Sequence, residues 1–213
     1  MSDILNKIKM AVIEHDVDSI LGLTQQALKE GLLPKDILDN GLVPGMDYVG
    51  VQFRKGEMFV PEVLFSARAM QASLSILRPL FAQTGAKMLG KVVLGTVKGD
   101  LHDIGKDLVG MMLEGAGFEV INLGKDVAPE AFVKAVRDNE PDIVGMSALL
   151  TTTMTAMGTT IKALEEAGLR DRVKVMVGGA PLTTDFAQRI GADGYGASAP
   201  AAVDLARKFV GAQ

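Results

Sequence analysis

The sequence predicts an α/β protein in two parts: a four-helix bundle over residues 1–88, followed by a doubly wound parallel sheet of five strands over residues 89–213. Up to about residue 88, apolar residues recur with helical spacing, and no segment has the character of a strand. Beyond it, short apolar runs alternate with amphipathic segments. This alternation is typical of right-handed crossovers, which build a parallel sheet covered by helices on both faces.

Caps, glycines and prolines set the limits of the four helices. A Ser2 or Asp3 cap begins the first helix, and Gly31 ends the second. The third helix is expected to be interrupted or bent near residues 41–45, and Pro61 suits the first turn of the fourth. The expected helices are residues 4–13, about 18–30, about 34–53 and about 61–80, and residues 85–90 form the predicted linker.

The second part opens with a Val-rich run that indicates a buried strand. Four further runs of this kind follow, each separated from the next by a segment with helical spacing. The expected strands are residues 92–97, 119–123, 143–147, 173–177 and 193–195, and the expected helices are about 104–116, 129–139, 154–168, 183–190 and 199–210.

Composition excludes several classes of protein. The net charge of −4 and the pI near 5.3 argue against a nucleic-acid-binding surface. No apolar run reaches the roughly 18 residues of a membrane span, and the N-terminus lacks a signal pattern, so a cytoplasmic protein is expected. Cysteine is absent, which excludes disulfides and thiolate metal sites, and two histidines are too few for a histidine cage around a metal.

Polar and glycine-rich segments follow four of the predicted strands. The first carries Asp100 and His102, the third is the hydroxyl-rich segment 147–153, the fourth is the pair Gly178-Gly179, and the fifth contributes Gly194-Tyr195-Gly196-Ala197. Since the carboxyl ends of parallel strands share one edge, these loops are expected to form one ligand-binding rim. Asp100 can hold one imidazole nitrogen of His102 and leave the other for a metal. Taken singly, the hydroxyl run is also explained as helix capping and the glycine pair as a turn.

Together, three blocks resemble the signature of the cobalamin-binding proteins, Asp-x-His-x-x-Gly, Ser-x-Leu and Gly-Gly. They are Asp100-x-His102-x-x-Gly105, Ser147-x-Leu149 and Gly178-Gly179. The intervening stretches are residues 106–146 and 150–177, which suit the family's layout. The resemblance implies a flavodoxin-like, Rossmann-like fold for the second part.

The resemblance also assigns roles to the rim. The corrin ring gives cobalt four nitrogens, so one protein histidine suffices. His102 would be the lower axial ligand of a cofactor bound base-off, Asp100 would bond its other nitrogen, and Thr153 stands where related proteins place a serine in this relay. Asp103 and Lys106 are expected to start the following helix. The other residues expected to contact the cofactor are Gly99, Asp103, Ile104, Gly105, Ser147, Leu149, Thr151, Gly178 and Gly179, with Tyr195 and Ala197 as the far wall of the slot for the nucleotide tail.

The resemblance extends into the bundle. The segment 49–63 is similar to the cap over the upper cobalt face in methyl-carrying relatives, where Phe53, Val60 and Val63 would shield the methyl–cobalt bond. The alternative is that these three side chains are ordinary bundle core. Residues 82–90 are the expected hinge by which the cap would swing aside.

The chain most resembles the small corrinoid proteins of methyltransferase systems. Such a protein accepts a methyl group on cobalt(I) from a substrate-specific methyltransferase. It passes the group, via methyl-cobalt(III), to a second methyltransferase that acts on tetrahydrofolate or a thiol. The chain is then a methyl-carrying subunit and no complete enzyme alone, and a separate reductive activase is expected because no iron–sulfur cysteines are present.

Three alternatives compete with this interpretation. A cobalamin-dependent sensor would need a DNA-binding segment, and no basic helix-turn-helix precedes the bundle. The small subunit of an adenosylcobalamin mutase would not need the helical first part. A flavodoxin-like domain without cobalt would not need the three motif blocks. The methyl donor stays open among methanol, methylamines, betaines and methoxylated aromatics.

Overall fold

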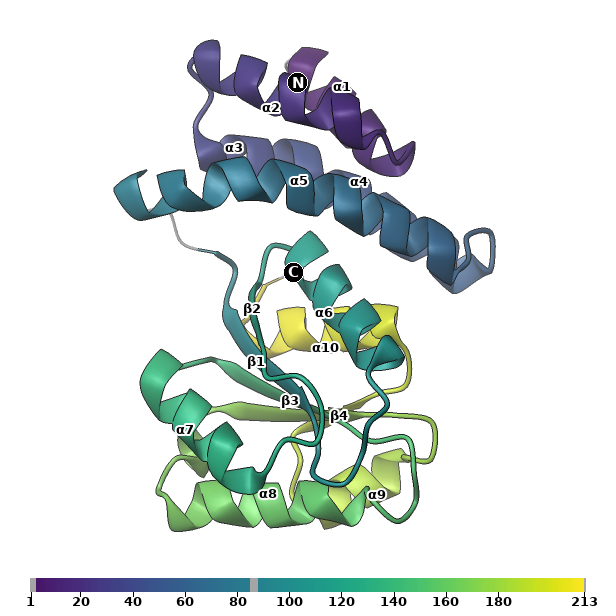
Figure 1. Ribbon diagram of the computed structural model, residues 1–213, viewed down its shortest axis with the longest axis vertical. Coiled ribbons are helices and arrows are strands. Elements are labelled where there is room, and N and C mark those ends of the chain that lie inside the picture. Colours follow the sequence, from purple (N-terminus) through teal and green to yellow (C-terminus); the bar gives the residue numbers. More distant parts are fainter. Residues whose placement is uncertain (1–2, 85–87, 213) are drawn as a thin grey trace. The chain divides into compact units, whose positions relative to one another are not determined.

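The computed structural model describes residues 3–84 and 88–212. These divide into two compact units, Met1–Met88 with Glu114–Gly117, and Leu89–Leu113 with Phe118–Gln213. We name them the helical unit and the sheet unit (Figure 1). No helix within the described ranges is both long enough and apolar enough to cross a membrane.

The helical unit contains the four predicted helices, the third of them in several segments. Its core is aliphatic, with Ile8, Ile20 and Leu74 among its fully or almost fully buried side chains. The buried hydroxyls of Thr24 and Ser73 share a 2.7 Å hydrogen bond, whereas the buried Oε1 atom of Gln52 has no hydrogen-bond partner among the described residues. The elements are α1 (Asp3–Ile13), α2 (Val17–Lys29), α3 (Pro34–Ile37), η1 (Leu38–Leu42), α4 (Val43–Lys55) and α5 (Val60–Thr84).

The predicted interruption of the third helix is confirmed. A π-helical turn, η1, joins α3 to α4, and Pro44 lies in the first turn of α4. Proline has no N–H and its ring crowds the carbonyl four residues earlier, so the backbone widens there. The fourth helix runs past its predicted end near residue 80 to Thr84 and contains Pro79. Of the predicted linker, residues 85–87 lie outside the described residues.

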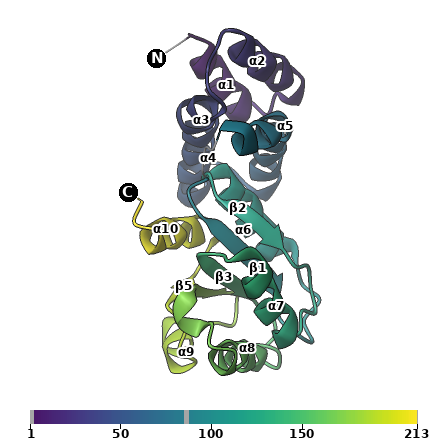
Figure 2. The same ribbon diagram turned by 90° about the vertical axis from the view of Figure 1, so that its left-hand side faces the viewer.

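The sheet unit has five parallel strands in the order β2-β1-β3-β4-β5. Every predicted strand is confirmed with both ends within one residue. Helices α6 and α10 lie on one face of the sheet, and α7, α8 and α9 lie on the other (Figures 1 and 2). The strands are β1 (Lys91–Thr96), β2 (Glu119–Asn122), β3 (Ile143–Ser147), β4 (Lys174–Gly178) and β5 (Gly194–Gly196).

The five helices of the sheet unit also match the prediction, with each end within two residues. A short 3₁₀ turn, η2 (Arg170–Arg172), precedes β4 and was not predicted. The helices are α6 (Ile104–Gly115), α7 (Pro129–Asn139), α8 (Thr155–Glu166), α9 (Thr184–Arg189) and α10 (Ala199–Phe209).

Strand register brings the carboxyl ends of four strands into one line. Thr96 of β1 pairs with Ser147 of β3, Ser147 pairs with Gly178 of β4, and Gly178 pairs with Gly196 of β5. The loops that follow these strands therefore leave the sheet side by side. This is the edge at which open α/β sheets bind ligands.

Asp193 links three segments of the sheet unit just before β5. Its carboxylate accepts 2.7 Å hydrogen bonds from the Val175 backbone N–H and from the Arg170 guanidinium, and Lys174 lies 3.4 Å away. Burial by itself raises the pKa of Asp193, but these hydrogen bonds and the two cations outweigh it and lower the pKa. The carboxylate therefore contributes stability in its ionised form.

We expect Asp193→Ala to lower the free energy of unfolding at pH 7 by about 1 to 3 kcal/mol, because it leaves the buried Val175 N–H and Arg170 without their acceptor. The contribution of the charge is complete above the unfolded pKa of about 3.9 and is lost as the pH falls through the lower folded pKa. Urea unfolding of the full chain at several pH values measures it.

Asp138→Ala is the matched control, since Asp138 forms an exposed ion pair with Lys134 on α7. We expect it to change stability by less than about 0.5 kcal/mol. Equal losses in the two variants would contradict the assignment to Asp193.

Candidate functional site

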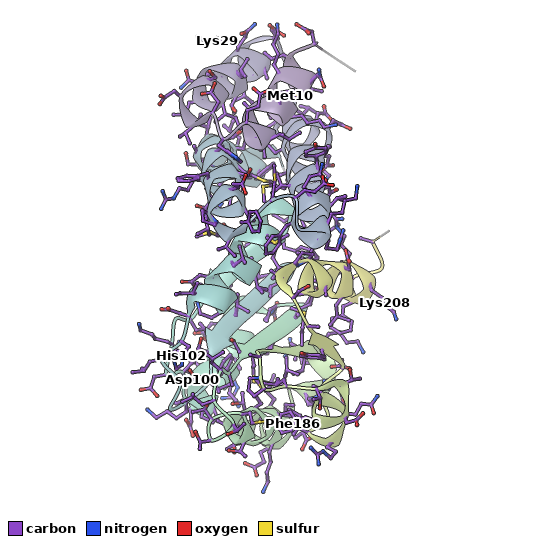
Figure 3. The ribbon with its side chains drawn as sticks, turned by 90° about the vertical axis from the view of Figure 1, so that its right-hand side faces the viewer. Met10, Lys29, Asp100, His102, Phe186 and Lys208 are labelled. Carbon is purple, nitrogen blue, oxygen red and sulfur yellow. The ribbon has the colours of Figure 1, made fainter. Side chains whose placement is uncertain are left out.

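Asp100 and His102 lie in the loop between β1 and α6 and contact each other directly (Figure 3). The Nδ1 atom of His102 is 2.7 Å from Asp100 Oδ1, and the same oxygen accepts a 3.0 Å hydrogen bond from the His102 backbone N–H. Asp100 is fully buried, whereas half of the His102 side-chain surface is exposed. The carboxylate therefore fixes one edge of the imidazole ring while the ring itself reaches the surface.

The second oxygen of Asp100 is held by the loop after β3. Thr153 donates its hydroxyl proton to Oδ2 over 2.6 Å, and the backbone N–H groups of Leu149 and Leu150 donate to the same atom over 2.8 and 3.2 Å. Thr153 is itself buried. The first and third rim loops, 53 residues apart at this contact, are thus joined through one carboxylate.

These contacts determine the charge of Asp100 and the tautomer of His102. Burial raises the pKa of the carboxyl, but hydrogen bonds from Thr153, from the backbone and from the His102 ring outweigh it and hold the pKa far below its usual range. An ionised carboxylate only accepts hydrogen bonds, so Nδ1 must carry the proton. The lone pair is then on Nε2, the nitrogen that a metal would take.

Large apolar side chains are exposed next to this imidazole in the sequence and on the adjoining loop. In monomeric proteins such groups usually mark a binding surface when they gather in one place. Here Leu149 and Leu150 bond to Asp100 through their backbones, so they lie beside His102. The exposed side chains are Leu101, Ile104, Leu149 and Leu150.

The glycine pair after β4 makes close contact with the loop after β3. Gly179 has φ +135°, and a Cβ atom there would lie 1.8 Å from the carbonyl oxygen of Ala148. A side chain is therefore excluded at this position. Ser147 pairs with Gly178 beside this contact, and both are partly exposed, while Thr151 on the loop after β3 is exposed. Tyr195 pairs with Val177 in β5, and the exposed Ala197 follows the same strand.

The structure thus brings the predicted residues of the loops after β1, β3, β4 and β5 to one edge of the sheet, whereas Tyr195 lies within β5 and packs against the hydrophobic core. The three predicted cap residues belong to the helical unit, where Val63 is fully buried and Phe53 and Val60 are partly buried.

Two residues that the sequence did not assign to the site lie next to its residues in the structure or in the sequence. Lys106, expected only as a helix-start residue, is buried and bonds to Asp107 and to Asn122 Oδ1. Asp126 hydrogen-bonds to Gly99. The one available signal for Asp126 is its position in the loop that follows the predicted strand 119–123. Asp103 precedes α6 and forms a 3.4 Å ion pair with Lys125.

Comparison with known proteins identifies the family. Two models, each described as a B12 binding domain, match residues 4–78 and 90–204. The chain is 46% identical to a corrinoid protein from Desulfitobacterium hafniense over 98% of both chains. It is 47% identical to trimethylamine corrinoid protein 2 from Methanosarcina acetivorans, over 95% of this chain and 94% of the relative. This chain belongs to the corrinoid proteins of methyltransferase systems.

Solved structures agree with this membership. The methanol:cobalamin methyltransferase complex from Methanosarcina barkeri matches all of this chain and 81% of that chain, with a TM-score of 0.88 and 31% identity. A cobalamin-binding protein from Desulfitobacterium hafniense matches 96% of this corrinoid protein and 98% of that chain, with a TM-score of 0.77 and 34% identity. The protein is therefore a corrinoid-binding, methyl-carrying component of a methyltransferase system.

The site fits a cofactor that brings its own metal ligands. Among the described residues there is no group of three or more histidine, cysteine or acidic side chains that could hold a bare ion. A corrin ring supplies four nitrogens in its plane and needs at most one further nitrogen below it. The exposed leucines beside His102 suit the apolar face of such a ring.

We expect Gly179→Ala in this corrinoid protein to lower the free energy of unfolding by about 2 to 4 kcal/mol, through backbone strain and overlap with Ala148. Urea unfolding of the apoprotein measures this loss. Gly158→Ala on α8 is the control, because its Cβ would meet only ordinary contacts at 3.6 Å or more and alanine favours helix. Unchanged stability of Gly179→Ala would show that the loop after β3 is free to move away.

Proposed function

We propose that this protein carries methyl groups between two methyltransferases on a corrinoid that is bound base-off, with Nε2 of His102 as the lower axial ligand of cobalt. The observation that carries the proposal is the buried Asp100 carboxylate, which holds Nδ1 at 2.7 Å and leaves the opposite ring nitrogen on the exposed side. When bound, the corrinoid supplies a cobalt centre that takes up a methyl group in its reduced state and gives it up again.

Asp100 and Thr153 would adjust the strength of His102 as a ligand. A carboxylate bonded to Nδ1 raises the basicity of the imidazole and fixes the orientation of its ring. The Thr153 hydroxyl has one proton and two acceptors within reach, Asp100 Oδ2 at 2.6 Å and the Leu150 carbonyl at 3.0 Å. Turning this hydroxyl would change the number of hydrogen bonds on Asp100, and with it the basicity of the imidazole, when His102 binds or leaves cobalt.

The rim would take the nucleotide tail of the cofactor. Support comes from the side-by-side ends of β3, β4 and β5, where Ser147, Gly178 and Gly196 pair in one line. Hydroxyls of Ser147 and Thr151 offer polar contacts, and Leu149, Gly178, Gly179 and Ala197 complete the slot. Gly99, Asp103, Ile104 and Gly105 would contact the corrin itself.

The helical unit would cover the upper face of cobalt. The support is the resemblance of residues 49–63 to the cap of methyl-carrying relatives, which gives Phe53, Val60 and Val63 the role of excluding water from the methyl group. Movement about residues 82–90 would let each partner enzyme reach cobalt in turn.

The partners would be a substrate-specific methyltransferase, a second methyltransferase that acts on tetrahydrofolate or a thiol, and a separate reductive activase. The relatives named for trimethylamine and dimethylamine support a methylamine as the donor, while a structure of a methanol complex keeps methanol open. The activase is proposed because the chain contains no cysteine for an iron–sulfur cluster.

Visible spectra of the methylcobalamin-loaded protein and of His102→Ala test the ligand. We expect the spectrum of a histidine-ligated cofactor from the wild type and that of an unligated cofactor from the variant. Since His15 is the only other histidine, His15→Ala is the control and should keep the wild-type spectrum. Identical spectra for wild type and His102→Ala would exclude His102 as the ligand.

The substitution Gly105→Ala tests corrinoid binding without lowering the stability of the fold. A Cβ atom at Gly105 would meet nothing within 4 Å, and the residue lies in a helix, so alanine should leave stability unchanged or raise it by up to about 1 kcal/mol. If the corrin passes over this residue, the added methyl group should nevertheless weaken corrinoid binding. Titration with hydroxocobalamin, followed by absorbance, measures the affinity.

Gly22→Ala, on α2 and equally free of neighbours, is the control for both readouts. Wild-type affinity in Gly105→Ala would place the corrin elsewhere.

A further inference from the structure

Asp126, in the loop between β2 and α7, holds the segment that leads to His102. Its carboxylate accepts a 2.8 Å hydrogen bond from the Gly99 backbone N–H and lies 3.1 Å from the Lys98 ammonium. Its own backbone N–H donates to the Asp100 carbonyl over 3.0 Å. Asp126 therefore contacts three consecutive residues, 98–100, of the loop between β1 and α6.

The backbone of Asp126 is in the left-handed region, with φ +55°. Within the described residues, only His15 and Glu140 share this conformation among the non-glycine residues. A side chain in this region costs free energy and persists where surrounding contacts require it. Here the conformation turns both the N–H and the carboxylate of Asp126 toward the same loop.

The contacts of Asp126 begin where those of the sheet end. Pairing of Val97 with Val127, and of Thr96 with Gly124, already fixes the bases of the two loops. The contacts of Asp126 lie beyond them, on residues 98–100, and Gly99 is itself at φ +84°. They therefore fix the backbone from which the Asp100 side chain extends to His102.

We propose that Asp126 is a positioning residue for corrinoid ligation. By clamping Gly99 and Asp100, it keeps the Asp100 carboxylate in contact with Nδ1 of His102 and so presents Nε2 to cobalt. This inference rests on the proposed ligand role of His102. The position of Asp100 must be held closely, because the 2.7 Å hydrogen bond between Asp100 Oδ1 and His102 Nδ1 weakens when it lengthens.

Two substitutions separate the carboxylate from the backbone. Asp126→Gly adopts positive φ readily and removes the acceptor of the Gly99 N–H. Asp126→Asn keeps an oxygen acceptor and tolerates positive φ, so it should rescue the function. Glu140→Gly is the matched control, since Glu140 is also an acid at positive φ in the sheet unit and pairs with Arg172, away from the site.

The first measurement is nitrogen NMR of the histidine-labelled apoprotein at fixed pH. The chain has two histidines, so two imidazoles are seen, and His15, bonded to Ser66, is an internal reference. We expect His102 to be mainly the Nδ1–H tautomer in the wild type, in Asp126→Asn and in Glu140→Gly. In Asp126→Gly it should move toward the tautomer mixture of a free imidazole, while His15 stays unchanged.

The second measurement is the ratio of histidine-ligated to unligated cofactor in the methylcobalamin-loaded protein. By analogy with other residues that support metal ligands, we expect it to fall about 3- to 10-fold in Asp126→Gly and less than about 2-fold in Asp126→Asn and Glu140→Gly. Wild-type values of both readouts in Asp126→Gly would overturn the inference, as would equal losses in Glu140→Gly. His102→Ala, measured in parallel, distinguishes the two failures: a wild-type spectrum there overturns the proposed ligand itself.

Discussion

The site depends on one buried carboxylate with five hydrogen-bond donors. Asp100 has no exposed surface, so its charge is tolerated only because each oxygen is bonded: one to the backbone and ring of His102, the other to Thr153 and two backbone N–H groups. Removing donors from a buried charge is costly. The Asp100 carboxylate therefore both joins the loops after β1 and β3 and orients His102. A change in the structure of either loop would also change the orientation of the imidazole.

This arrangement explains how a protein with so few metal-ligating side chains serves a metal cofactor. Under the proposed ligation, the corrin ring would supply four nitrogens to cobalt, and the single imidazole of His102 would be enough from the protein. What the protein must supply is orientation, basicity and a surface for a large, partly apolar ring. Asp100 gives the first two, and the exposed leucines suit the third.

The strands and the motif residues were predictable because their signals are local. Short apolar runs predict β1, β3 and β4, and Asp100, His102 and Thr153 stand in recognisable spacing after the predicted strands. The supports behind them were not predictable. Asp126 follows Gly124-Lys125 in a segment with the composition of an ordinary turn. Its contacts with the loop between β1 and α6 form only when the two loops come together in the fold. The extension of α5 from its predicted end near residue 80 to Thr84 was also not predicted.

The hydrogen bonds of Asp126 to the loop between β1 and α6 also bear on how His102 would behave during methyl transfer. Under the proposed ligation, His102 would bind and leave cobalt during each methyl transfer, and its imidazole would need to keep its position throughout. The hydrogen bonds of Asp126 would not depend on this exchange, since they go to backbone groups of Gly99 and Asp100 and not to His102. The Thr153 hydroxyl, with two acceptors in reach, is the part that can respond. The contacts of Asp126 would thus fix the position of the loop that carries His102, while the Thr153 hydroxyl would adjust the hydrogen bonding of Asp100.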